Sequence, residues 1–104
     1  MSEKTFTAAA KLDEVPAGEQ KVVTLNGNEI LLCNNGERIY AVRNLCSHAY
    51  ETLHCGRMRN GWIACPVHGA RFDLETGEVL GPPAVLPIDV FEVRIVEDTI
   101  EVAV

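Results

Sequence analysis

The sequence has little positive charge and no long apolar run. Nine Lys and Arg stand against fifteen Asp and Glu, so the formal net charge is −6 and the pI is about 4.9. Nucleic-acid binding needs clustered basic residues that neutralise phosphates, and this balance argues against it. No stretch approaches the roughly 20 apolar residues of a membrane span, and the N-terminal segment lacks a signal-peptide pattern. We therefore expect a soluble, cytoplasmic protein with neither a nucleic-acid nor a membrane partner.

Histidine and cysteine are also scarce, and their positions are informative. The three histidines are residues 48, 54 and 68, and the four cysteines are residues 33, 46, 55 and 65. Four cysteines in a short secreted chain would suggest two disulfides, but a reducing cytosol favours metal binding instead. Two of the histidines follow a cysteine by two or three residues, which gives the pairs Cys46/His48 and Cys65/His68. We expect Cys33 and Cys55 to be thiols that bind no metal.

Each of these two pairs mixes a sulfur and a nitrogen donor. Two thiolates and two imidazoles suit either zinc or an iron–sulfur cluster. A single zinc is usually held by Cys-Cys and His-His pairs, or by cysteine alone. Two facing loops of mixed type can instead place both sulfurs on one metal and both nitrogens on a second. The spacing alone does not exclude a structural zinc module. A nucleophile–base pair of Cys65 and His68 has no third residue to orient it, and Pro66 suits a ligand loop better.

The flanking segments have the pattern of short antiparallel strands. Apolar and β-branched runs at 20–25, 29–33 and 38–42 are separated by Asn-Gly turns, and alternating residues at 91–96 and 100–104 predict a half-buried hairpin turning at 97–98. Residues 8–12 could be helical but are too few to form an isolated helix. The fold class is therefore all-β, as a small antiparallel sandwich or barrel of about seven to ten strands.

The middle of the chain has a different composition. Residues 44–83 are rich in Gly, Pro, Cys and His, with brief strands expected at 61–64 and 71–74 and a turn at 75–78. We interpret 1–104 as one domain, in which 1–43 and 84–104 form a scaffold and 44–83 form an inserted metal-binding lobe. Ordering such irregular loops costs conformational entropy, so we expect the lobe to need its metal to be well ordered.

The residues of the lobe resemble the Rieske iron–sulfur family. Cys46-Ser47-His48 and Cys65-Pro66-Val67-His68-Gly69 are similar to its C-x-H and C-P-x-H-G motifs, 72–78 to its F-D-x-x-T-G-x segment, and 81–84 to its proline loop. The resemblance implies one [2Fe–2S] cluster per chain. It also implies that Cys46 and Cys65 bind the inner iron, while His48 and His68 bind the outer iron and face solvent or a partner.

Departures from that family pattern indicate the subtype. Respiratory Rieske subunits have an extra cysteine in each loop, where this chain has Glu51 and Val67, so the loop disulfide of those subunits cannot form here. High-potential members also have a Ser and a Tyr that donate hydrogen bonds to the cluster, where this chain has Ala70 and Phe72. We therefore expect a potential at the low end of the Rieske range of about −150 to +300 mV.

With these departures, the sequence resembles the stand-alone ferredoxin of bacterial ring-hydroxylating dioxygenase systems. This implies an electron carrier rather than an enzyme. Its partners would be a flavin-dependent ferredoxin reductase and a terminal oxygenase with Rieske and mononuclear iron centres, and it would be monomeric. The alternative within the same family is the small Rieske-type subunit of a nitrite reductase, and a structural zinc module is less favoured.

The charge is distributed unevenly along the chain. Residues 43–80 contain four basic and four acidic residues. The flanking scaffold segments contain the other five basic and eleven acidic residues, so the whole excess of −6 lies there.

Overall fold

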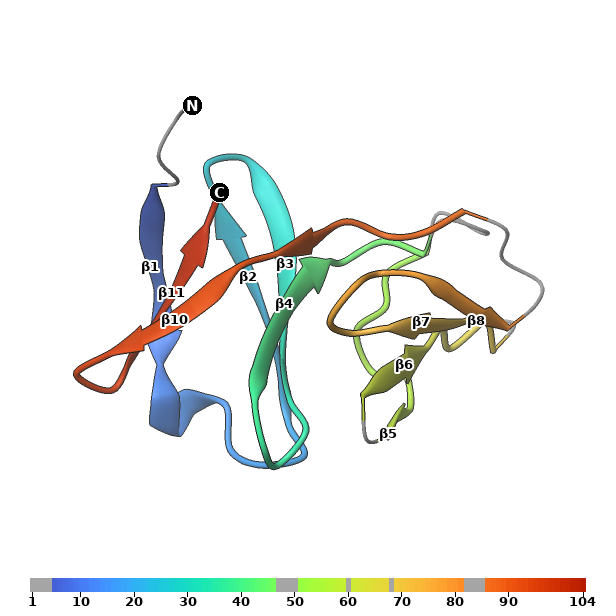
Figure 1. Ribbon diagram of the computed structural model, residues 1–104, viewed down its shortest axis with the longest axis horizontal. Helices are drawn as coiled ribbons and strands as arrows, with labels where there is room; N and C mark the ends of the chain where they lie inside the picture. The colour runs from blue at the N-terminus through green and yellow to red at the C-terminus, as the bar shows by residue number, and fades with distance from the viewer. Residues whose placement is uncertain (1–4, 47–50, 60, 68, 82–85) are drawn as a thin grey trace.

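The computed structural model describes residues 5–46, 51–59, 61–67, 69–81 and 86–104 (Figure 1). Within these ranges the chain forms eleven strands and one 3-10 turn, arranged as three antiparallel sheets. The all-β prediction is confirmed, with one strand more than the upper number expected. No helix among the described residues is long and apolar enough to cross a membrane.

Two of the sheets form the scaffold. The first has the order β1-β11-β10, and the second has the order β2-β3-β4-β9. The strands are β1 (Phe6–Lys11), β2 (Gln20–Leu25), β3 (Asn28–Asn34), β4 (Ile39–Arg43), β9 (Val90–Phe91), β10 (Val93–Val96) and β11 (Thr99–Ala103), with the 3-10 turn at Leu12–Glu14. Residues 8–11 are therefore strand rather than helix, because pairing with β11 satisfies their backbone groups.

The third sheet lies to one side of the scaffold (Figure 1). Its order is β5-β6-β7-β8, formed by Met58–Arg59, Trp62–Ala64, Arg71–Asp73 and Val79–Gly81. The strands expected at 61–64 and 71–74 and the turn at 75–78 are confirmed. All four strands fall within 44–83, but the division of the domain at these two boundaries stays a prediction.

Local turn chemistry explains two of the scaffold hairpins. Asn26 and Gly27 link β2 to β3 with φ of 50° and 81°, and Glu97 and Asp98 link β10 to β11 with φ of 47° and 63°. Positive φ at both central residues is the geometry that matches the twist of a two-residue hairpin. In the second hairpin Ile100 and Val102 are buried as expected, whereas Ile95 is 47% exposed because β10 is an edge strand.

Strand β3 is the centre of the molecule because both of its faces are buried. Ile30 and Leu32 pack with Ile100 and Val102 in the core between the two scaffold sheets. Leu31 and Cys33 point to the opposite face and join a second core that includes much of the lobe. Alternation along one strand thus connects the scaffold core to the residues around the predicted metal loops.

Candidate metal centre

The first predicted metal loop begins just after β4. Cys46 is completely buried, and its backbone N–H donates to the carbonyl oxygen of Glu51 at 2.7 Å. This bond brings together the two ends of segment 47–50, which contains His48 and lies outside the described residues. The thiol of Cys46 is therefore fixed at the base of the first loop.

The second predicted metal loop begins just after β6. Cys65 is 2% exposed, its N–H donates to the carbonyl oxygen of Ala70 at 2.7 Å, and its own carbonyl accepts from the N–H of Gly69 at 2.9 Å. Gly69 has a φ of 76°, a left-handed conformation that glycine adopts without steric cost. These contacts connect Cys65, after β6, to Gly69 and Ala70, before β7. His68 lies outside the described residues.

The structure brings Cys46 and Cys65, from the two predicted metal loops, into the same buried cluster. Leu53, Ile63 and Phe72 are buried in that cluster as well. Two buried cysteines, one at the start of each predicted loop, would supply the sulfur half of the predicted donor set. In the described part of the chain no three metal-ligating side chains converge, and both predicted histidines lie outside that part.

The other two cysteines occupy different environments. Cys33 lies on β3, and burial raises the pKa of its thiol from 9.0 to about 12, which keeps the thiol protonated and unreactive. Cys55 is exposed, with its Sγ 3.3 Å from Nδ1 of His54. Neither lies on the two loops that carry Cys46 and Cys65. The prediction that both are thiols that bind no metal therefore agrees with their positions but has not been tested.

Asn44 is a structural residue of the site that sequence reasoning missed. It is 4% exposed, and its side-chain oxygen accepts from the N–H of Leu53 at 3.0 Å and of His54 at 2.9 Å. Its side-chain nitrogen donates to Oε2 of Glu29 at 2.7 Å. Asn44 thus ties β3 to the segment between the two metal loops, two residues before Cys46. The available signal in the sequence was the position of Asn44, a polar residue between a strand and the predicted ligand Cys46.

Two glycines permit close backbone approaches within the lobe. A Cβ at Gly56 would overlap the carbonyl oxygen of Ala64, the residue before Cys65. A Cβ at Gly77 would overlap the carbonyl oxygen of Ile88, and Gly77 also has a φ of 80°. Only glycine fits such positions, so both help to set the backbone that carries the second loop.

The positions that distinguish high-potential Rieske proteins are buried here. Ala70 and Phe72 are both completely buried, in the same cluster as Cys46 and Cys65. Neither side chain has a hydroxyl group, so neither can donate a hydrogen bond to a group held by these cysteines.

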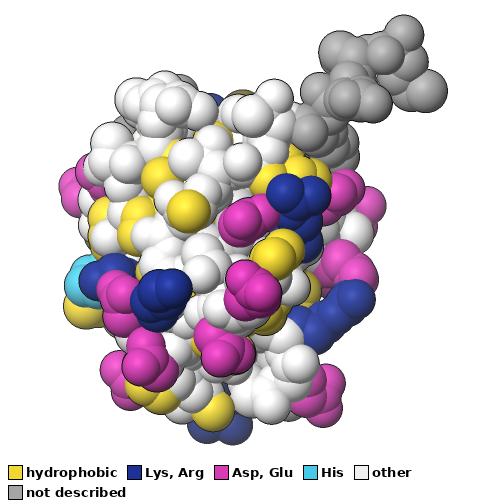
Figure 2. Space-filling model, turned by 90° about the vertical axis from the view of Figure 1, so that its left-hand side faces the viewer, with side chains coloured by type: hydrophobic (Ala, Val, Ile, Leu, Met, Phe, Trp, Pro, Cys, Tyr) yellow, Lys and Arg dark blue, Asp and Glu magenta, His cyan; other side chains and the backbone are white. Residues whose placement is uncertain are grey.

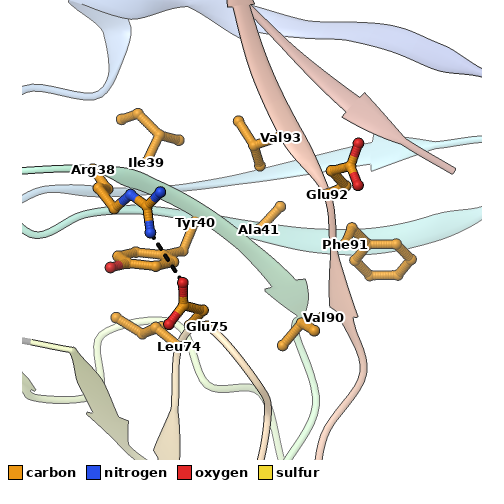
Figure 3. A pocket seen from close by; sticks show the side chains of 10 residues that line it. All are labelled: Arg38, Ile39, Tyr40, Ala41, Leu74, Glu75, Val90, Phe91, Glu92 and Val93. Atoms are coloured by element: carbon orange, nitrogen blue, oxygen red, sulfur yellow. Dashed lines mark hydrogen bonds and ion pairs between the residues drawn. The ribbon is translucent and has the colours of Figure 1, made fainter.

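A cleft of about 470 Å³ lies where the scaffold meets the turn after β7 (Figure 3). Tyr40 and Phe91 contribute aromatic side chains, and Arg38 Nη1 lies 3.0 Å from Oε1 of Glu75 across the cleft. Both side chains of that ion pair are exposed, so the pair contributes little to stability. The described residues lining the cleft include neither cysteine nor histidine, so it is separate from the candidate metal centre.

Comparison with known proteins identifies this arrangement. Residues 5–92 match the family model of the Rieske [2Fe–2S] domain. The chain is 39% identical over 87 residues to the ferredoxin component of the naphthalene 1,2-dioxygenase/salicylate 5-hydroxylase systems of Ralstonia sp., with 84% of each chain covered.

Solved structures agree with the sequence comparison. The ferredoxin of carbazole 1,9a-dioxygenase from Nocardioides aromaticivorans IC177 superposes with a TM-score of 0.90 at 35% identity, covering 95% of this chain and 97% of that one. The complex of reduced oxygenase and oxidized ferredoxin in carbazole 1,9a-dioxygenase contains a chain with a TM-score of 0.88 at 26% identity, covering 97% of this chain and 94% of that one.

Proposed function

The chain belongs to the Rieske [2Fe–2S] domain family, and from that premise we propose that it is a soluble one-electron carrier between a flavin-dependent ferredoxin reductase and a terminal ring-hydroxylating oxygenase. The observation that carries this proposal is the burial of Cys46 and Cys65, which begin the two predicted metal loops, in one core cluster. When bound, a [2Fe–2S] cluster supplies a one-electron redox couple. The chain is an electron-transfer component, as are its ferredoxin relatives, and not a catalytic subunit.

The family match and the donor chemistry of the two loops support a ligand set for this cluster. Cys46 and Cys65 would bind the inner iron, since both thiols are buried in the same cluster. His48 and His68 would bind the outer iron and complete the Rieske donor set of two sulfurs and two nitrogens. The family match also favours iron–sulfur over the structural zinc module that spacing alone left open.

The ligand assignment is tested by purifying the protein and measuring iron, acid-labile sulfide, visible absorption and the EPR spectrum of the reduced form. We expect about two irons and two sulfides per chain, as in any [2Fe–2S] protein. Cys65→Ser should lose the cluster, whereas Cys55→Ser, a matched change at an exposed thiol, should keep it. A colourless protein that contains zinc, or an unaltered cluster in Cys65→Ser, would contradict the assignment.

The buried, hydroxyl-free side chains of Ala70 and Phe72 support a low reduction potential. Hydrogen bonds to a cluster stabilise the additional electron, and fewer donors leave the reduced state less favoured. We expect a midpoint near the lower end of the range of about −150 to +300 mV, measured by redox titration. A midpoint above about +100 mV would contradict this inference.

The direction of electron flow is tested by reconstitution. The carrier should be reduced by a flavin-dependent reductase with NADH or NADPH, and it should support turnover of a terminal oxygenase. Its relatives include ferredoxin components of naphthalene and biphenyl dioxygenase systems, which favour this assignment over the nitrite reductase subunit. Electron delivery to a nitrite reductase but not to an oxygenase would reverse that choice. A monomeric state and a cytoplasmic location belong to the same proposal, and sedimentation and cell fractionation test them.

A further inference from the structure

The lobe sheet has one face that points away from the core. Alternation along its strands sends Ile63 and Phe72, which are paired across β6 and β7, into the core, where both are completely buried. The neighbouring residues therefore point to the opposite, outer face. Pairing places Arg59 opposite Trp62 and Arg71 opposite Ala64, so these four side chains share that outer face.

Arg71 is stacked at the centre of this face. Its Cζ lies 5.5 Å from the centre of the Trp62 ring, within the range of a cation–π contact. Its guanidinium also lies over Gly81, its partner on β8, where a Cβ would come within 3.0 Å of Nη2. Trp62 is half-buried while Arg59 and Arg71 are exposed. The result is a planar aromatic ring flanked by two exposed guanidinium groups.

The basic residues of the lobe differ from those of the scaffold in their pairing. Scaffold Lys21, Arg38, Arg43 and Arg94 each lie within ion-pair distance of a carboxylate. Figure 2, which shows the scaffold end of the molecule, displays Lys and Arg interspersed with Asp and Glu. The charges of these four scaffold cations are therefore locally compensated.

Within the described residues, no cation of the lobe forms such an ion pair. Arg57, Arg59 and Arg71 are exposed, and none has a carboxylate within ion-pair distance in that part of the chain. Asp73 is the acidic residue on the outer face, and its Oδ1 already accepts from two N–H groups of the following turn. The outer face is thus a cationic and aromatic patch on a chain whose net charge is −6.

From this placement we propose that Arg59, Trp62 and Arg71 form a docking surface for a carboxylate-rich patch on a redox partner protein. Charge complementarity selects such an occupant, because a guanidinium binds a carboxylate through two parallel N–H donors. Tryptophan and arginine are also the residues most often found to dominate binding energy at protein interfaces. The acidic scaffold repels the same partner, so the two ends of the molecule together orient the encounter.

The patch adjoins the candidate metal centre. Arg71 directly follows Ala70, whose carbonyl closes the turn that begins at Cys65. A partner seated on the patch would therefore lie next to the loop from which the electron leaves. This inference rests on the proposed function, since it assumes that the partner exchanges electrons with the chain.

The chain contains a single tryptophan, which allows docking at the patch to be observed directly. The cluster-loaded protein is produced with 5-fluorotryptophan and titrated with the unlabelled reductase and oxygenase of the same organism. The ¹⁹F signal comes from Trp62 alone and should shift or broaden to saturation with at least one partner. An unchanged signal with both proteins overturns the proposal.

Matched variants test the role of charge at the patch. Arg59→Gln and Arg71→Gln should each weaken the affinity about threefold, and the double variant about tenfold, at low ionic strength. Arg94→Gln removes the same charge from the scaffold and should change the affinity less than about twofold. Arg71→Lys keeps the charge and should recover part of the loss. Equal effects at Arg94 and Arg71 overturn the proposal.

Electron transfer by the wild-type protein is measured in parallel. If electrons reach the oxygenase while the Trp62 signal stays unchanged, the docking surface is wrong and the proposed function stands. If the signal saturates but no electrons pass, the docking surface stands and the proposed function fails. Circular dichroism of each variant confirms that the fold is unchanged, so an affinity loss is not caused by unfolding.

Discussion

Asn44→Ala should loosen the connection between the scaffold and the lobe. The wild-type side chain is 4% exposed and makes three hydrogen bonds, two accepted from Leu53 and His54 and one donated to Glu29. Alanine leaves the two backbone N–H groups without their acceptor in a buried site. Each orphaned buried donor costs about 1–3 kcal/mol, so we expect a loss of about 2–4 kcal/mol once some water enters the space left by the amide.

That loss is large compared with the roughly 5–15 kcal/mol that stabilise a small domain. It should be concentrated locally, because the two amides belong to the segment between the metal loops. Amide hydrogen exchange of the cluster-loaded protein reports it directly. Protection of Leu53 and His54 should fall roughly 30-fold or more, as 1.4 kcal/mol corresponds to a factor of ten.

Asn28→Ala provides a matched control. Asn28 lies on the same strand as Glu29, but its side chain makes only one long contact, 3.5 Å to the carbonyl of Asn26. Its loss should cost less than about 0.5 kcal/mol. A destabilisation by Asn44→Ala below about 1 kcal/mol, or unchanged protection at both amides, would refute the assignment of Asn44 as the connecting residue.

Three further predictions concern the core, the backbone and the potential. Because burial raises the pKa of Cys33 to about 12 while the unfolded thiol titrates near 9.0, the unfolded chain loses the proton first as pH rises. The free energy of unfolding should therefore fall by about 1.4 kcal/mol per pH unit between those values, and urea titrations of Cys33→Val should lack this slope. Gly77→Ala and Gly36→Ala both place alanine at positive φ, but only at Gly77 would the new Cβ overlap the carbonyl of Ile88. Thermal unfolding should show a loss of about 1–2 kcal/mol for Gly36→Ala and at least about 3 kcal/mol for Gly77→Ala, so equal losses would contradict the close approach. Phe72→Tyr adds a hydroxyl beside Cys46 and Cys65 and should raise the midpoint potential in a redox titration, and an unchanged midpoint would show that this position does not influence the reduced state.

The local elements of the fold were largely predictable from the sequence. Asn26 and Gly27 accept positive φ readily, so the turn between β2 and β3 is determined by two adjacent residues. The segment at 8–12 was ambiguous because three consecutive alanines favour a helix in isolation. Strand β1 instead pairs with β11, and Phe6 lies opposite Ala103, more than ninety positions later in the chain. This pairing overrides the local preference for a helix.

The sequence predicted the chemistry of the candidate site but not the residues that hold its loops in place. The mixed Cys/His pairs suit either zinc or an iron–sulfur cluster, and the resemblance of the surrounding residues to the Rieske family favours the two-iron centre. The burial of Cys46 and Cys65 in one cluster agrees with it. Asn44 gave no comparable signal, because its role depends on Leu53, His54 and Glu29 meeting it in space.

By itself, then, the sequence determined the turns and the strand-forming runs and supplied the candidate sulfur and nitrogen donors, because each depends on residues close together along the chain. The tertiary structure alone decided that β3 is buried on both faces and that Arg59, Trp62 and Arg71 share the outer face of the lobe sheet. These features depend on which strands pair and in which register. A shift of one residue would turn every side chain to the opposite face, and only the packing of the whole chain fixes that choice.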